Sequence, residues 1–207
     1  MALGRTALVS LIVLAGPELA CAQKATPTRA GAAQPPPPAA EQIAAAVLPL
    51  PEQFRASATV LGYGPEGGLR ELRKGTGPFI CLASDPAGER FHVACYHRSL
   101  DPFMARGRAL RAQGVKGQQV DSARFAEIRA GKLQVPDHPA ALYSLTGPAG
   151  AFDPKTGTAP KARRLFVVYV PNATPETTGL SPQPVEGSPW IMDPGTPKAH
   201  IMFVPRM

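Results

Sequence analysis

Two cysteines, Cys81 and Cys95, make the most specific chemical prediction in this 207-residue chain. They lie in the segment 79–97 (FICLASDPAGERFHVACYH), which is typical of two strands around a turn at 85–90. In an antiparallel hairpin, the numbers of paired residues have a constant sum, and that sum is even when the loop has an odd number of residues. The sum of 81 and 95 is even, so a loop of odd length can place Cys81 directly opposite Cys95. Opposed side chains share a face about 4.5 to 5.5 Å apart, within disulfide reach. We favour a disulfide; the alternative is two buried free cysteines that act as small hydrophobic residues.

A catalytic role for Cys95 is the main alternative hypothesis, because a thiolate beside a base is a nucleophile. His97 is two positions further along the same strand face, and His200 could approach from the last predicted strand. Three further residues could orient an imidazole: Asp101, Asn172 and Asp193. This set would suit a hydrolase or transferase, but a disulfide would abolish it. No C-x-x-C redox motif is present, so the sequence does not predict an oxidoreductase. The sequence leaves open whether the protein is an enzyme, and we favour a non-enzyme.

Metal binding is the second alternative, because the chain has four histidines, His92, His97, His138 and His200. His92 and His97 are five apart, so on a strand they point to opposite faces and form a poor chelating pair. H-x-x-x-H, H-E-x-x-H and paired C-x-x-C motifs are absent. Zinc could still bind through His97 and His200 with a carboxylate. We therefore assign no metal site and expect no cofactor.

Two features could bind a ligand without catalysis. Arg108 and Arg111 are three apart and share a helix face, where they could hold a carboxylate, a phosphate or a lipid headgroup. The alternative is the solvated side of an amphipathic helix. Trp190 lies in the proline-rich segment 189–197 and could be either a binding anchor or a lid over the core. No glycine-rich phosphate loop or G-x-S-x-G motif is present.

Residues 1–22 have the pattern of an export signal peptide. Arg5 precedes the apolar run 7–15 (ALVSLIVLA), and Ala20-Cys21-Ala22 forms an A-x-A cleavage site. The mature chain is thus predicted to begin at Gln23, in an oxidising periplasmic or extracellular space. Lipid anchoring through Cys21 is the less favoured alternative, because Glu18 stands where a lipoprotein signal has leucine.

The remaining chain is predicted to comprise a linker rich in proline and alanine (23–38) and one globular domain (39–207). The net charge of +7 is scattered along the chain without interleaved aromatic residues. This distribution does not indicate nucleic-acid binding. No segment of the mature chain is apolar for long enough to span a membrane. The oligomeric state is not predicted.

The pattern of the domain predicts an α+β fold, with a largely antiparallel sheet and two central helices packed on one face. Expected strands cover residues 57–63, 68–73, 78–84, 91–97, 141–145, 164–170 and 200–204. Expected helices cover 39–48, 101–114 and 121–130, and one helical turn covers 174–179. Asp101 is expected to cap the first central helix, and Asp121 or Ser122 the second. The segment 164–170 (RLFVVYV) is apolar on both faces, which favours an interior strand.

Two stretches, 91–111 (FHVACYHRSLDPFMARGRALR) and 189–205 (PWIMDPGTPKAHIMFVP), resemble uncharacterised exported bacterial proteins with no assigned activity. The resemblance implies a bacterial envelope or secreted setting. It transfers no fold, ligand, cofactor or catalytic residue. Our leading interpretation is an exported, non-enzymatic domain that binds a small molecule or an envelope component. Its candidate surface combines the His97 region, the basic helix flank and the Trp190 segment.

Overall fold

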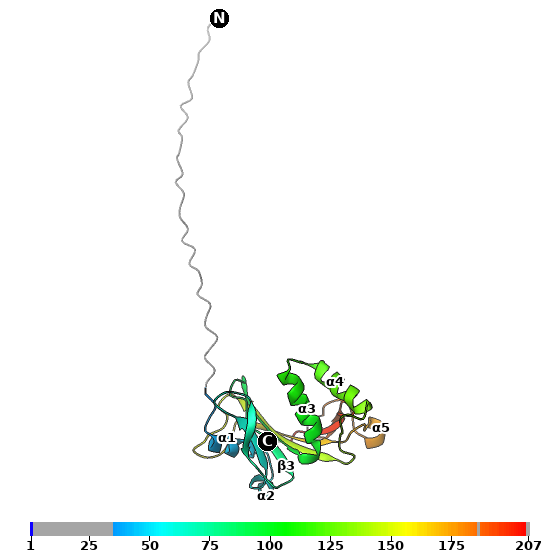
Figure 1. The fold of residues 1–207 in the computed structure, drawn as a ribbon. Helices are drawn as coiled ribbons and strands as arrows, with labels where there is room; N and C mark the ends of the chain where they lie inside the picture. Colours follow the sequence, from blue (N-terminus) through cyan, green and yellow to red (C-terminus); the bar gives the residue numbers. More distant parts are fainter. Residues whose placement is uncertain (2–34, 186, 206–207) are drawn as a thin grey trace. The chain divides into compact units, whose positions relative to one another are not determined.

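The computed structural model describes residues 1, 35–185 and 187–205 (Figure 1). The predicted leader beyond Met1, including Cys21, lies outside the described residues, as does the linker up to residue 34. The boundaries proposed for the leader, the linker and the domain therefore stay predictions.

Five α-helices are present in the described part of the chain: α1 (Ala39–Ala46), α2 (Glu52–Arg55), α3 (Asp101–Ala112), α4 (Gln118–Arg129) and α5 (Pro175–Thr178). A 3-10 turn, Arg98–Leu100, runs directly into α3, so Asp101 is the first residue of that helix rather than its cap. Helix α4 begins three residues before the predicted cap. Its N-cap is Gly117, whose φ of 55° and ψ of −140° suit glycine and strain other residues.

Eight strands form one sheet in the order β2-β1-β3-β4-β5-β6-β8-β7. Their bounds are β1 Thr59–Tyr63, β2 Leu69–Arg73, β3 Phe79–Leu82, β4 Arg90–His97, β5 Ala140–Pro148, β6 Arg163–Tyr169, β7 Trp190–Met192 and β8 His200–Phe203. Every neighbouring pair is antiparallel except β1 and β3, which are parallel. A mixed α+β fold with a mostly antiparallel sheet is thus confirmed.

The pattern did not predict three features of this sheet. Strand β7 occupies part of the proline-rich segment that we expected to be a loop, and it pairs with β8. Helix α2 was not expected. The parallel pairing of β1 with β3 arises because β2 returns to one side of β1 and the chain then crosses to the other side.

Alternation along β4 divides the core between the two faces of the sheet. Phe91, Val93 and Cys95 point to the face that carries side chains of α1, including Ala45 and Ala46. On the opposite face, Tyr96 of β4, Ile80 and Val167 share a buried cluster with residues of the central helices, namely Phe103, Phe125 and Ile128. We call these the α1 face and the α3 face.

Gln42 fastens α1 to β1, the second strand of the sheet. Its buried side-chain amide donates to the carbonyl oxygens of Pro37 at 2.7 Å and Tyr63 at 3.0 Å. Its Oε1 accepts from the backbone N–H of Tyr63 at 2.8 Å. The close approach requires glycine at position 62, where a Cβ would lie 2.6 Å from Gln42 Oε1 and 2.4 Å from Leu72 Cδ1.

No helix within residues 35–185 and 187–205 combines the length and the apolarity that a membrane crossing requires.

Candidate functional site

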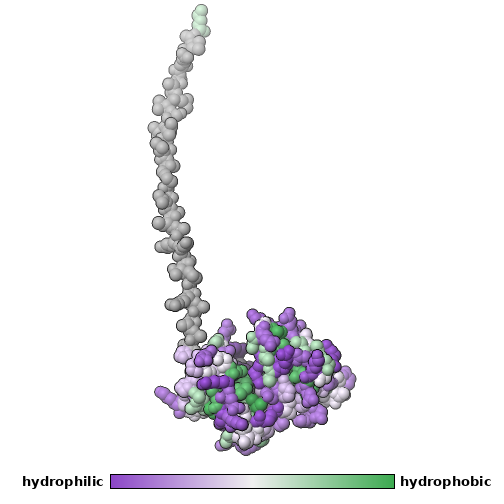
Figure 2. Space-filling model, in the orientation of Figure 1, coloured by the Kyte–Doolittle hydropathy of each residue, from purple (hydrophilic) through white to green (hydrophobic). Residues whose placement is uncertain are grey.

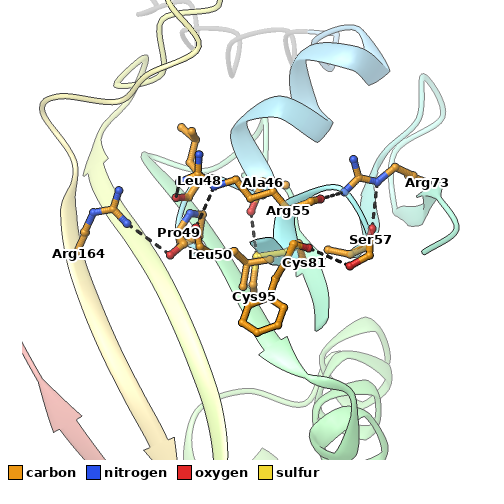
Figure 3. The surroundings of a disulfide bond; sticks show 12 residues. Ala46, Leu48, Pro49, Leu50, Arg55, Ser57, Arg73, Cys81, Cys95 and Arg164 are labelled. Atoms are coloured by element: carbon orange, nitrogen blue, oxygen red, sulfur yellow. Dashed lines mark hydrogen bonds between the residues drawn. A yellow bond between two sulfur atoms is a disulfide. The ribbon is translucent and has the colours of Figure 1, made fainter. Parts of the chain in front are cut away.

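Cys81 and Cys95 form a disulfide, as predicted from their parity. They are directly opposed in the antiparallel pair of β3 and β4, and both residues are fully buried. Figure 3 shows the bond beside the end of α1, where Cys95 Sγ lies 3.1 Å from the carbonyl oxygen of Ala46. A sulfur in a disulfide carries no proton, so this contact is a close approach without a hydrogen bond. The thiolate that a cysteine nucleophile needs is absent in this state.

His97 lies on the α1 face, two residues beyond Cys95. Its Nδ1 is 2.8 Å from Ser99 Oγ, and its ring meets Phe79 edge-on with centroids 5.9 Å apart. The ring of His138 lies 6.2 Å away, centroid to centroid. These contacts place His97 in an aromatic cluster where the chain turns from β4 into α3.

His200 lies on the other face of the sheet. Cys95 pairs with Tyr143, Tyr143 with Phe166, and Phe166 with Phe203, so these residues share the α1 face. His200 is three residues before Phe203 on the same strand and therefore belongs to the α3 face. The structure does not bring His200 together with Cys95.

The surroundings of His200 hold the imidazole in place. The ring stacks on Tyr169 with centroids 5.2 Å apart, and Nδ1 lies 2.8 Å from the carbonyl oxygen of Lys198. Burial lowers the pKa of His200, which favours the neutral ring. Among the described residues, no group of three or more histidine, cysteine or acidic side chains could hold a metal ion.

The two arginines singled out from the sequence have different surroundings. Arg108 donates to the hydroxyl of Tyr96 at 2.8 Å and to Asp101 Oδ1 at 3.2 Å. Tyr96 in turn donates to Asp101 Oδ1 at 2.7 Å. Arg108 therefore serves an internal network at the start of α3. Arg111 is exposed and makes no side-chain hydrogen bond to another described residue.

Trp190 is buried, with 7% of its surface exposed, at the start of β7. Its indole Nε1 has no hydrogen-bond partner among the described residues. It pairs with Met202 of β8, which packs against the cluster on the α3 face. This placement is that of a residue covering the core.

An ion-pair network joins α4 to the connection between β7 and β8. Lys198 Nζ lies 3.0 Å from Asp121 Oδ2 and 3.2 Å from Asp193 Oδ2. Asp121 also pairs with Arg124, whose buried guanidinium lies over the ring of Phe103 at 3.7 Å. Burial alone would raise the pKa of Asp121, but hydrogen bonds from Arg124 and Lys198 outweigh it and lower that pKa. The network holds these elements together.

An open groove occupies the part of the α3 face formed by β1 to β4. We define it by Tyr63, Leu69, Leu82, His92 and Ala94, which line a cavity of about 420 Å³. Leu82 and Ala94 are paired across β3 and β4, and Leu69 is 38% exposed at the sheet edge. Figure 2, in the orientation of Figure 1, shows hydrophobic atoms gathered over the strands beside α3. An open cavity with an apolar lining of this kind is typical of a binding surface.

Two titratable side chains of the open groove have shifted pKa values. Desolvation, and then the charge of Arg90, lower the pKa of His92, whose Nδ1 lies 2.8 Å from Thr146 Oγ1. Partial burial, and then the carboxylate of Asp85, raise the pKa of Tyr63. Both groups are therefore neutral near pH 7 and available as polar partners on an apolar floor. Shifted pKa values of this kind cluster at functional sites.

The open groove was not predicted, although one part of it could have been. Parity along β4 places His92 and Ala94 on the face opposite Cys95. Tyr63 and Leu69 come from the β1–β2 hairpin, which reaches β3 through a parallel pairing that no local pattern encodes.

Comparison of the chain with protein-family models, with curated proteins and with solved structures finds no match. The fold and its surfaces define a class: a mixed α+β domain with one buried disulfide and an open sheet face. What this domain does is inferred from its own residues.

Proposed function

We propose that the protein is an exported, non-catalytic binding domain whose ligand lies in the open groove. The observation that supports this most directly is the apolar lining of the cavity, the exposed Leu69 and the half-buried Leu82, beside two neutral polar groups, His92 and Tyr63. A mostly apolar cavity with a few placed polar groups is the usual form of a small-molecule site.

The arrangement of the helices explains why the groove is open at the β2 edge of the sheet. We infer that the two central helices, α3 and α4, pack together on the α3 face, because Phe103, Phe125 and Ile128 share one cluster with Tyr96 and Val167. This cluster also includes Ile80 and Leu82 of β3, so the helices leave open mainly the β2 edge, where Leu69 is 38% exposed.

The chemistry of the lining defines the class of ligand. The floor offers dispersion contacts to an apolar body, and the neutral Tyr63 hydroxyl and His92 ring offer hydrogen bonds to an uncharged polar group. Asp85, Glu89 and Arg90 at the rim carry mixed charge, so the rim has no strong preference for an anion or a cation. The expected ligand is thus a small, largely apolar molecule without net charge.

The buried disulfide also supports the exported setting. A disulfide between fully buried cysteines is expected of a chain that folds in an oxidising space. The bonded sulfurs also give no support to the cysteine hydrolase or transferase alternative. Neither that alternative nor a histidine metal site is favoured by a specific contact.

A neutral fluorescent probe, N-phenyl-1-naphthylamine, tests the open groove. We expect its emission to rise on binding, and Leu69→Gln to weaken binding at least threefold. Met192→Gln is the matched control, because Met192 is also 38% exposed but lies on the strand at the opposite edge of the sheet. Equal affinity of the two variants for the probe would overturn the assignment.

A further inference from the structure

A second cavity lies on the α1 face and is basic. Its volume is about 580 Å³, and its lining includes Arg55, Arg163 and Arg164 with the apolar residues Leu48, Leu145 and Phe166. We call it the basic groove. No aspartate or glutamate is among the residues that line it.

The charges of the basic groove have no carboxylate partner in the described chain. All ion pairs between described residues lie elsewhere, in the segments 101–138 and 193–200. Arg55 donates instead to the carbonyl oxygens of Leu50 at 2.9 Å and Leu48 at 3.2 Å. Arg164 donates to the carbonyl oxygen of Pro49 at 3.4 Å, as Figure 3 shows. Bonds to neutral carbonyl groups position these guanidinium groups, and no carboxylate of residues 35–185 or 187–205 forms an ion pair with them.

Donors also remain for a ligand. Arg164 is exposed and lies on the α1 face, opposite Leu145 of β5. Arg164 uses one of its several N–H groups on Pro49. A guanidinium presents its N–H groups in a planar fork that matches a carboxylate or phosphate.

The other side of the basic groove is apolar. Leu145 is 4% exposed, and Leu48 packs against the same buried cluster. Phe166 is half-buried, and its ring contacts Tyr143 and Phe203 with centroids 5.7 Å and 6.3 Å apart. An alkyl chain laid on these side chains would be removed from water.

We propose that the basic groove binds a single-chain anionic amphiphile. Its carboxylate or phosphate head meets Arg164, which shares the α1 face with Leu145, and its alkyl chain lies against Leu145 and Phe166. The site is independent of the open groove, because Leu145 and Phe166 belong to the α1 face and the open groove to the α3 face. It also takes a different ligand, charged rather than neutral.

Calorimetric titration with decanoate and decyl phosphate, below the concentrations at which they form micelles, tests the proposal. Both are expected to bind. Inorganic phosphate, which lacks the chain, and decyl maltoside, which lacks the charge, are expected to bind at least tenfold more weakly. Octanoate should bind more weakly than decanoate, by about twofold to fourfold for each buried methylene that is lost. Equal binding of inorganic phosphate and decyl phosphate would overturn the role of the chain.

Arginine variants test the head group. Arg164→Gln is expected to weaken decanoate binding about tenfold, because charge-assisted hydrogen bonds are lost. Arg129→Gln is the matched control, since Arg129 is an exposed arginine without an ion pair at the end of α4. Circular dichroism of each variant shows that the fold persists. Equal losses in Arg164→Gln and Arg129→Gln would show a general charge effect and overturn the site.

Vesicles distinguish a monomeric amphiphile from a lipid surface. The proposal expects decanoate to bind without vesicles present. Binding to phosphatidylglycerol vesicles without binding of monomeric decanoate would overturn it in favour of a membrane surface. Leu69→Gln should leave decanoate binding unchanged, which separates failure of this proposal from failure of the open groove.

Discussion

The rings of Tyr169 and His200 stack with centroids 5.2 Å apart, where α4 meets the connection between β7 and β8. Asp193 Oδ2 lies 3.9 Å from Nδ1 of this histidine. Lys198, two residues before it, pairs with both Asp193 and Asp121 of α4. The contacts that hold His200 are thus part of the structure that holds α4 to the sheet.

Replacement of Asp121 by asparagine should destabilise the protein. The buried charge of Arg124 would lose its carboxylate, which we expect to cost about 2 kcal/mol of unfolding free energy at pH 7. The lowered pKa of Asp121 stabilises the fold at pH values above the unfolded pKa of about 3.9, and that stability is lost as the pH falls through the folded pKa. Urea unfolding between pH 7 and pH 2.5 should therefore show that acid lowers the unfolding free energy less in Asp121→Asn than in the wild type. The exposed Glu66→Gln is the control, and a similar acid profile in both variants would contradict this role.

Loss of the Tyr96 hydroxyl should also destabilise the fold. Tyr96→Phe removes a bond to Asp101 and one from Arg108 in a fully buried position, at a cost of about 2 kcal/mol at pH 7. Chemical denaturation measures this cost. Tyr143→Phe is the control, because its hydroxyl makes no hydrogen bond to a described residue. Equal stability of the two variants would contradict the assignment.

The alkaline limit of stability should depend on the same tyrosine. Burial raises the pKa of Tyr96 above its usual value, with the hydrogen bond to Asp101 as the next cause. A raised folded pKa stabilises the protein below the unfolded pKa of about 10, and this stability is lost as the pH rises above it. The unfolding free energy should fall more steeply above about pH 10 in the wild type than in Tyr96→Phe. If the unfolding free energy of the two proteins fell in parallel with pH, Tyr96 would ionise equally in the folded and unfolded states, which would contradict this prediction.

The disulfide should resist reduction in the folded protein. Both sulfurs are fully buried, so mild dithiothreitol should leave them bonded until urea unfolds the chain. Alkylation and mass spectrometry in a Cys21→Ser background report on Cys81 and Cys95 alone. Cys81→Ala/Cys95→Ala should lower the unfolding free energy by about 3 kcal/mol, as expected for a loop of this length. Rapid native-state alkylation without reductant would instead show free thiols.

The register of the disulfide could be predicted because it depends on one local hairpin. Parity and the length of the turn between β3 and β4 placed Cys81 opposite Cys95 without knowledge of other strands. The parallel pairing of β1 with β3 could not be predicted in this way. It depends on where the β1–β2 hairpin docks, and that is decided by burial of α1 and the disulfide together.

The roles of single side chains were harder to predict. Arg108 has the spacing of a solvated helix flank, yet Tyr96 and Asp101 lie within its reach once α3 packs on β4. The segment around Trp190 has the prolines of a loop, yet three of its residues pair with β8. Both outcomes depend on contacts between elements that are distant in the sequence, and the two grooves depend on such contacts entirely.

Gln42 gives the chain before α1 a fixed point of attachment. Its single side-chain amide bonds the carbonyl of Pro37 and both backbone groups of Tyr63 in β1. Tension applied to residues preceding Pro37 would therefore reach the sheet through this amide as well as through the first turn of α1. Mechanical load would be shared with β1, so a pull on the N-terminal side need not unwind the helix first.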